Sequence, residues 1–250
     1  MKTFKTYIIE SKSADQYEVD VANHLNSMEN VVAERPRVSA KYADVLVSLS
    51  SGKGPVWLEV KMNHTDNLGN PRIYYDGSKW DTTYTTPLAK FSVDLANRSQ
   101  QTKDFINAIS KFSDISRPKI PTTKGGLRDS EAVPLSVMKE YFKQPDVNRY
   151  IAMESDVDIG KLVTQHYLEG KAEPAYYMQA GDDFYMIGRA NPLGLPRDIP
   201  LVSGRGNFKV RVATRSQFYE VQAEVKIIKM PNSSYSIKPG TNKKNPFESL

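Results

Sequence analysis

The sequence predicts an α/β (α+β) fold, in which a central mixed β-sheet is flanked by helices and followed by a β-rich C-terminal elaboration. Three observations favour this class. An amphipathic segment lies near the N-terminus, short runs rich in β-branched residues follow it, and helical and hairpin patterns share the C-terminal half. The chain of 250 residues is 39% apolar and 25% charged, which is the composition of an ordinary globular protein.

The first elements follow from side-chain periodicity. Residues 13–28 open with the capping candidates Ser13 and Asp15 and carry apolar side chains at helical spacing, so we expect a helix there. β-branched residues then predict a series of short strands, two of which are joined as a hairpin by the turn at 52–55. These strands are expected at 31–38, 44–49, 56–62 and 72–75.

The rest of the chain alternates helical and hairpin patterns. Residues 88–112 are helical in pattern with a polar centre, which predicts either two helices or one kinked helix. The loop at 116–128 contains four basic and no acidic residues. Further helices are expected at 134–143 and 158–170, and hairpins that turn at 181–183 and near 215–216. From residue 231 the chain is polar, and we expect a frayed tail.

Charge and cysteine content narrow the classes of partner and site. A formal net charge of +5 and a pI near 9.1 favour a polyanionic partner. The chain has no cysteine, which excludes disulfides, thiolate metal sites and cysteine nucleophiles and fits a reducing compartment. No apolar run reaches the roughly 20 residues of a membrane span, and the N-terminal segment lacks the apolar core of a signal peptide. We therefore expect a cytoplasmic protein without membrane contacts.

Charged residues interrupt two apolar runs that are otherwise typical of buried strands. Asp44 begins one run, and Glu59 and Lys61 lie in the middle of the next. Because strand side chains alternate between faces, Glu59 and Lys61 share one face, and Asp44 comes alongside Glu59 if the hairpin register allows it. Unpaired charge in such a setting costs several kcal/mol and needs mutual pairing or an ion. Oxygen ligands without cysteine or histidine favour a hard cation such as Mg²⁺.

This arrangement resembles a known family of nucleases. Asp44, followed fifteen residues later by the triplet Glu59-Val60-Lys61 on a strand, is similar to the D-x(n)-E-x-K signature of the PD-(D/E)XK, or restriction-endonuclease-like, superfamily. The expected order of elements also agrees: helix, strand, strand with the aspartate, strand with the triplet, helix. The resemblance covers roughly residues 13–112 and departs from the family pattern in having Ala43 rather than proline before Asp44.

The resemblance implies a Mg²⁺-dependent DNA endonuclease, for which Mn²⁺ can replace Mg²⁺. By this resemblance, Asp44, Glu59 and the carbonyl of Val60 would bind the metal. Glu18 on the first helix would assist, because it falls within the apolar stripe that faces the sheet. Lys61 would position or deprotonate the attacking water, or contact the phosphate. DNA is the implied partner. A homodimeric restriction-type enzyme and a phage-type or repair nuclease both fit the pattern.

The resemblance also sets an expected organisation of the chain. We expect a nuclease core at 1–115, a basic linker or DNA-contacting loop at 116–133, an elaboration or second subdomain at 134–230, and the polar tail at 231–250. Polar side chains on the helix after the core strands, and basic side chains in the loop, are candidates for contacts with phosphates. They are Arg98, Gln101 and Lys103 on the helix, and Arg117, Lys119, Lys124 and Arg128 in the loop.

The same residues have other interpretations. Glu59 and Lys61 can also lie on the solvated face of a hairpin, as we expect for a second E-x-K triplet, Glu224 to Lys226, which lacks a suitably spaced aspartate. The chain would then be a non-catalytic nucleic-acid-binding or viral assembly protein. A small-molecule enzyme lacks support, because no Gly-rich phosphate loop, G-x-S-x-G or H-E-x-x-H motif occurs. His64 follows the triplet closely enough to contact a phosphate, whereas we expect His24 and His166 to pack or face solvent.

Overall fold

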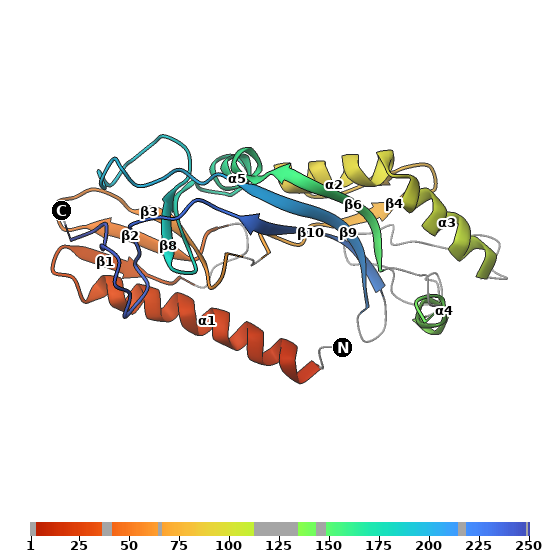
Figure 1. Ribbon diagram of the computed structural model, residues 1–250, viewed down its shortest axis with the longest axis horizontal. Helices are drawn as coiled ribbons and strands as arrows, with labels where there is room; N and C mark the ends of the chain where they lie inside the picture. The colour runs from red at the N-terminus through yellow and green to blue at the C-terminus, as the bar shows by residue number, and fades with distance from the viewer. Residues whose placement is uncertain are drawn as a thin grey trace. The chain divides into compact units, whose positions relative to one another are not determined.

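The computed structural model describes residues 4–36, 42–64, 67–112, 135–143, 149–214, 219–248 and 250 (Figure 1). It confirms the predicted class, since helices flank a mixed β-sheet. The chain divides into two compact units. The first unit comprises Met1–Asp66, Asp158–Arg205 and Ile227–Leu250, and the second comprises Asn67–Val157 and Gly206–Lys226.

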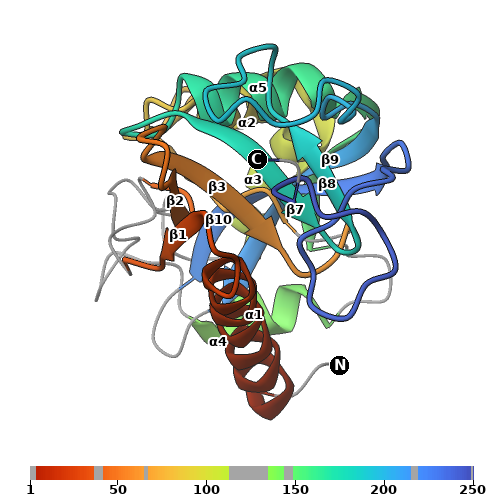
Figure 2. The ribbon, with the colours of Figure 1, turned by 90° about the vertical axis from the view of Figure 1, so that its left-hand side faces the viewer.

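The first unit is built on a five-stranded sheet with the strand order β1-β2-β3-β7-β8. β3 and β7 run parallel, and the other neighbouring pairs are antiparallel. Figure 2 shows the two helices of this unit on opposite sides of the sheet. The elements are α1 (Phe4–Asn26), β1 (Val31–Glu34), β2 (Val45–Leu49), β3 (Val56–Lys61), α5 (Ile159–Leu168), β7 (Ala175–Ala180) and β8 (Asp183–Met186).

The alternation of side chains along β3 divides it between two environments. Leu58 and Val60 are buried in one core cluster with Val21 and Leu25 of α1, so the even-numbered positions of β3 face α1. Because successive strand side chains point to opposite faces, the odd-numbered positions face the other side of the sheet. Glu59 and Lys61 therefore share the face covered by α5, as the sequence pattern predicts for this pair.

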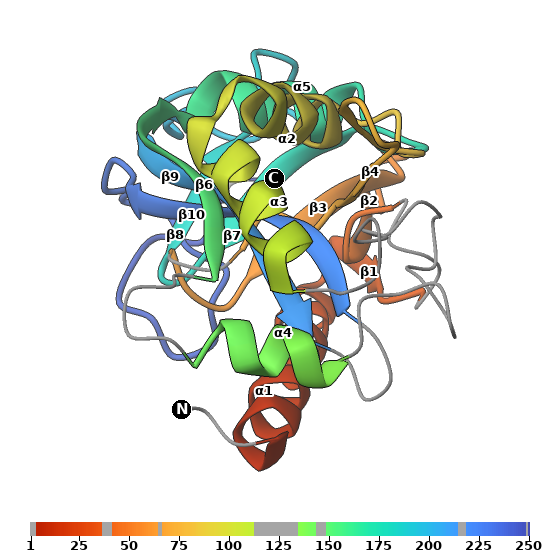
Figure 3. The ribbon, with the colours of Figure 1, turned by 90° about the vertical axis from the view of Figure 1, so that its right-hand side faces the viewer.

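The second unit carries a second five-stranded sheet with the order β5-β4-β10-β9-β6. The helical segment that begins near residue 88 is two helices, which Figure 3 shows one after the other. Ser99 separates them, because its backbone is extended at φ −80° and ψ 128°. The elements are β4 (Arg72–Tyr75), β5 (Trp80–Asp81), α2 (Pro87–Arg98), α3 (Gln100–Phe112), α4 (Leu135–Tyr141), β6 (Tyr150–Asp158), β9 (Arg205–Thr214) and β10 (Tyr219–Lys229).

The compact units do not follow the boundaries expected from the sequence. The first unit is assembled from three stretches of chain, because β3 finds its parallel partner β7 more than a hundred residues further on. Hydrophobic periodicity describes each element but not its distant partner, so it cannot reveal such interleaving. Among the helices that the structure describes, none is long and apolar enough to cross a membrane.

The segment after β10 is not the frayed tail expected from its polar composition. Tyr235, Ile237 and Phe247 are buried in the core of the first unit. The backbone also pairs with the sheet, since the Phe184 amide donates to the Tyr235 carbonyl at 2.9 Å and the Ile237 amide donates to Gln179 Oε1 at 3.0 Å. Only Tyr235 and Ile237 lie at strand spacing, and two positions are too few to show a period, which is why the sequence pattern did not identify this segment.

Truncating Ile237 tests this packing. Its side chain is fully buried, so Ile237→Ala is expected to lower the free energy of unfolding by about 2–4 kcal/mol, the usual cost of a cavity at a buried isoleucine. Lys238 is exposed, so Lys238→Ala is the matched control and should change stability by less than about 0.5 kcal/mol. Urea unfolding of the full chain measures both. Equal stability of the two variants would mean that the segment is frayed after all.

Candidate active site

Asp44 lies directly beside the strand that carries the triplet. In the β2–β3 register Val45 pairs with Leu58, and the Asp44 amide donates to the Leu58 carbonyl at 3.2 Å. Asp44 directly precedes Val45, the last paired residue of β2, and so lies beside residues 58–60 of β3. The pairing of β2 with β3 ends there, and Asp44 Oδ2 instead accepts a hydrogen bond from the Val60 amide at 2.9 Å. The register condition that the sequence analysis attached to Asp44 is therefore met.

The backbone of Val60 faces the same side as Asp44. Leu58 uses its carbonyl toward β2, whereas the Lys61 carbonyl accepts from the Gly181 amide at 2.9 Å on the β7 side. Backbone groups of alternate strand residues point to the same side, so the Val60 carbonyl faces the β2 side, beyond the last paired residue of β2. Asp44 and the Val60 carbonyl thus supply oxygen atoms at one break in the sheet.

Glu59 is a buried carboxylate in which one oxygen has partners and the other has no hydrogen-bond partner among the described residues. It is only 2% exposed. Its Oε1 accepts from the Tyr167 hydroxyl at 2.8 Å and pairs with Lys61 Nζ at 2.5 Å. Within the described residues, the buried Oε2 atom has no hydrogen-bond partner. Burial acts to raise the pKa of Glu59, but Lys61 and Lys171 outweigh it and hold that pKa below its ordinary value, so Glu59 is ionised.

The raised pKa of Asp44 indicates an excess of negative charge at this site. Burial, followed by the neighbouring Glu59 carboxylate, raises the pKa of Asp44 from 3.8 to about 7, although Lys61 opposes the shift. Glu18 on α1 raises it further. Around neutral pH the protein therefore either holds a proton on Asp44 or carries an incompletely compensated carboxylate there.

Lys61 is the cation of the site. Burial acts to lower its pKa, but Glu59, Tyr167 and Asp44 together raise it well above its ordinary value. Its side chain is 17% exposed, so the ammonium is sheltered yet within reach of a ligand. Lys61 consequently stays protonated at neutral pH, which suits it to positioning water or a phosphate oxygen better than to removing a proton.

Glu18 belongs to the same electrostatic group but is held by a partner of its own. Its Oε2 accepts from Arg35 Nε at 2.6 Å, and Arg35 also bonds Asp15 at 2.8 Å. Burial raises the pKa of Glu18 more than Arg35 lowers it. The buried Nη1 of Arg35 has no acceptor among the described residues. Glu18 can therefore approach a ligand at Asp44 only if its pairing with Arg35 changes.

These oxygen atoms have the chemistry that a hard cation prefers, but among the described residues too few acidic side chains are gathered to enclose an ion. The unpartnered Oε2 of Glu59, the raised pKa of Asp44 and the direction of the Val60 carbonyl all indicate oxygen atoms that a cation would satisfy. In the part of the chain that the structure describes, however, no three acidic or histidine side chains are set to enclose a metal ion. The donor set is thus two carboxylates and a backbone carbonyl, with Glu18 outside it.

Similarity to known proteins supplies no further evidence. No family model, curated protein or solved structure matches this chain. The interpretation of the site rests on its geometry and chemistry alone.

The second E-x-K triplet has a different environment. Glu224 Oε2 pairs with Arg211 Nε at 3.2 Å and its side chain is 18% exposed, while Lys226 faces solvent. The expected exposed face therefore holds for Lys226, whereas Glu224 is only partly exposed and serves as a matched control for Glu59.

Three of the residues expected to contact DNA belong to the second unit, and the other four are loop positions. Arg98 forms an ion pair with Glu154, and Gln101 and Lys103 are exposed on α3, all in the second unit. The four basic loop positions, Arg117, Lys119, Lys124 and Arg128, lie outside the described residues. Tyr177 and Tyr185 are buried and pack in the core.

Sequence reasoning missed the residues that surround the triplet and Glu18, which are Tyr167 on α5, Lys171 after α5 and Arg35 directly after β1. Tyr167 bonds Glu59, Lys171 lies 5.3 Å from the centre of the Tyr167 ring, and Arg35 pairs with Glu18. Burial raises the pKa of Tyr167 well above its ordinary value, so its hydroxyl remains a donor to Glu59. The 3–4 residue spacing of Ile159, Val163 and Tyr167 marks the buried face of a helix, but nothing local says which strand it covers.

Proposed function

We propose that the chain is a metal-dependent nuclease of the PD-(D/E)XK type, which hydrolyses phosphodiester bonds of DNA with Mg²⁺ or Mn²⁺. The observation that supports it most is the buried Glu59 carboxylate, which has one oxygen held by Tyr167 and Lys61 and the other without a partner among the described residues. A protein rarely leaves a buried carboxylate oxygen unsatisfied, and such an atom is explained when a ligand completes it.

The charges around Glu59 support a cation as that ligand. Asp44 and Glu59 are close enough for the Glu59 charge to raise the pKa of Asp44. A divalent cation held by Asp44, Glu59 and the Val60 carbonyl would offset this repulsion. When bound, it would supply positive charge that polarises the phosphodiester and stabilises negative charge developing on the phosphoryl oxygens.

The side chains around the cation site would orient Glu59, the attacking water and the phosphate. Tyr167 and Lys61 hold Glu59 in one rotamer, so its free oxygen is fixed in place. The Lys61 ammonium lies at the partly open side of the site, where it can orient the attacking water and offset charge on a phosphate oxygen. Arg35 could release Glu18 by binding a substrate phosphate, to which guanidinium groups bind well. Glu18 would then be free to join the cation ligands.

A cleavage panel tests the proposal. The substrates are supercoiled plasmid, linear duplex, single strand and a branched junction, each with Mg²⁺ or Mn²⁺ and with chelator. We expect metal-dependent cutting by the wild-type protein and by Glu224→Gln, and a loss of at least about 100-fold in Lys61→Ala, the range expected for an electrostatic group at the reacting phosphate. The preferred substrate identifies the subclass.

The opposite result is equally clear. If no substrate is cut but DNA is bound equally by the wild-type protein and Lys61→Ala, the chain is a nucleic-acid-binding protein, and the charged face of β3 is only an ion-paired surface. Equal cutting by wild type and Lys61→Ala would place the activity elsewhere in the chain.

A further inference from the structure

A second group of polar side chains lies on the same face of the sheet as Glu59 and Lys61. Lys61 of β3 pairs in register with Ala180 of β7, and Ala180 pairs with Asp183 of β8. Residues in one cross-strand row point to the same face. Neighbouring strands are about 4.8 Å apart, so the Cα atoms of Lys61 and Asp183 are on the order of 10 Å apart. Only the small side chain of Ala180 stands between them in this row.

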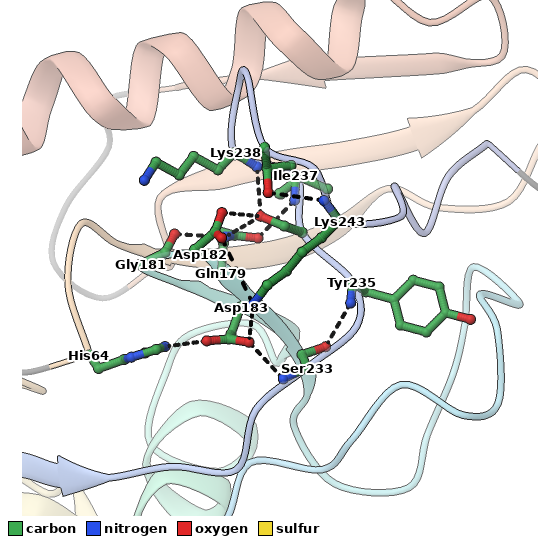
Figure 4. A network of polar contacts seen from close by, with 12 residues as sticks. His64, Gln179, Gly181, Asp182, Asp183, Ser233, Tyr235, Ile237, Lys238 and Lys243 are labelled. Atoms are coloured by element: carbon green, nitrogen blue, oxygen red, sulfur yellow. Dashed lines mark hydrogen bonds and ion pairs between the residues drawn. The ribbon is translucent and has the colours of Figure 1, made fainter.

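Asp183 is buried, and both of its carboxylate oxygens have polar partners. Its Oδ1 accepts from the Ser233 amide at 2.6 Å and from Lys243 Nζ at 2.6 Å, and its Oδ2 lies 2.9 Å from His64 Nε2 (Figure 4). Its side chain is 5% exposed. Asp183 thereby ties the segment after β10 to the end of β8 and holds one histidine in a fixed direction.

His64 is the exposed end of this arrangement. It follows Lys61 by three residues, and the turn beside it is joined to β3 by the bond from the Gly181 amide to the Lys61 carbonyl at 2.9 Å. Its side chain is 39% exposed, although Nε2 is directed at a buried carboxylate. With Nε2 paired with the Asp183 carboxylate at 2.9 Å, the other ring nitrogen, Nδ1, is the one left for a ligand. A carboxylate that fixes the tautomer and direction of an accessible imidazole is typical of acid–base chemistry.

We propose that His64, oriented by Asp183, is a further catalytic residue that gives a proton to the departing oxygen during phosphodiester cleavage. This inference rests on the proposed nuclease function. Asp44, Glu59 and Lys61 do not protonate the leaving group. The leaving 3′ oxygen of DNA departs as a strongly basic alkoxide unless it is protonated, so a proton donor is needed. The observation that supports this role is the cross-strand row from Lys61 to Asp183, in which Asp183 contacts the partly exposed His64.

The proton and electron balance of the step is simple. The oxygen of water forms a bond to phosphorus, and the bond from phosphorus to the bridging 3′ oxygen breaks with its electron pair on that oxygen. The proton on His64 Nδ1 passes to the departing oxygen, and a proton of the attacking water leaves to solvent. The neutral imidazole then regains a proton from solvent, while Nε2 stays beside the Asp183 carboxylate.

A sulfur substitution in the substrate separates this role from a structural one. The probe is a DNA duplex in which sulfur replaces the bridging 3′ oxygen at the bond that the wild-type protein cuts, compared with the same duplex carrying oxygen, both in Mn²⁺. A thiolate departs without protonation, so loss of the proton donor should matter only for oxygen. We expect His64→Asn to cut the oxygen duplex about 100-fold more slowly in single turnover and the sulfur duplex within about twofold of wild type.

The controls make each outcome decisive. His24→Asn removes a histidine on α1 that contacts Asn245, and it should leave both rates unchanged. Equal losses on both duplexes in His64→Asn would mean that His64 only positions or stabilises, and wild-type rates on both would mean that it does nothing; either result overturns the proton-donor role while leaving the nuclease proposal intact. Failure of the wild-type protein to cut any DNA overturns the nuclease proposal itself and, with it, this inference.

Discussion

Replacing Glu59 by glutamine is expected to abolish metal-dependent cleavage and to lower the free energy of unfolding by about 2–4 kcal/mol. Glutamine keeps an acceptor for the Tyr167 hydroxyl but removes the charge that pairs with Lys61 at 2.5 Å. Lys61 is then a sheltered ammonium without its main counter-charge, which is a costly state. Cleavage assays and urea unfolding of the same preparation measure both effects.

A double variant separates the two effects. In Glu59→Gln/Lys61→Met the unpaired charge is gone, so most of the lost stability should return, while cleavage stays absent because the cation ligand and the ammonium are both missing. Glu224→Gln is the matched control, since Glu224 is a partly exposed glutamate of the second E-x-K triplet and should cost less than about 1 kcal/mol. Cleavage by Glu59→Gln at the wild-type rate would remove Glu59 from the reaction, whatever its effect on stability.

Replacing Asp44 by asparagine is expected to stabilise the protein at alkaline pH and to have a smaller effect at acid pH. The folded chain holds the Asp44 proton with a pKa of about 7, raised by burial and by Glu59, whereas an unfolded chain has the ordinary value of 3.8. Between these values the folded state binds more protons than the unfolded state, so stability falls as pH rises. The penalty is absent below the unfolded pKa and complete above pH 7.

The size of the effect follows from the same linkage. Between pH 5 and pH 8, the stability of Asp44→Asn relative to wild type should rise by about 2 kcal/mol. Asparagine can still accept the Val60 amide hydrogen bond, so the backbone contact is kept. Urea unfolding of both proteins at the two pH values measures the difference. An unchanged difference would mean that Asp44 is ionised without cost and that the site has no excess of negative charge.

The parts of the site that lie close together in the sequence could be predicted from it. Strand alternation places Glu59 and Lys61 on one face, and the short turn at 52–55 fixes the β2–β3 register, which brings Asp44 beside the triplet. The apolar stripe of α1 also predicts that Glu18 faces the sheet, although it does not predict the pairing with Arg35 that keeps Glu18 outside the donor set. These inferences need only periodicity and one tight connection, which is why they hold without knowledge of distant pairings.

The parts that depend on distant pairings could not be predicted. Tyr167 reaches Glu59 only because β7 returns parallel to β3 after residues 67–157 of the second unit have intervened. The His64–Asp183 contact likewise needs the predicted β7–β8 hairpin to pair with β3, which the sequence does not show. The buried positions after residue 231 are too few and too irregular to show a period, although Tyr235 and Ile237 fill the core beside β8.

Binding of Mn²⁺ to the purified chain tests the central claim most directly, because it asks whether the carboxylates around Glu59 hold a cation at all. Free Mn²⁺ can be counted by its electron paramagnetic resonance signal during titration of wild type, Asp44→Asn, Glu59→Gln and Glu224→Gln. The account predicts one site that wild type and Glu224→Gln share and that Asp44→Asn and Glu59→Gln lose. Equal binding by all four proteins, or no binding by any, would contradict it.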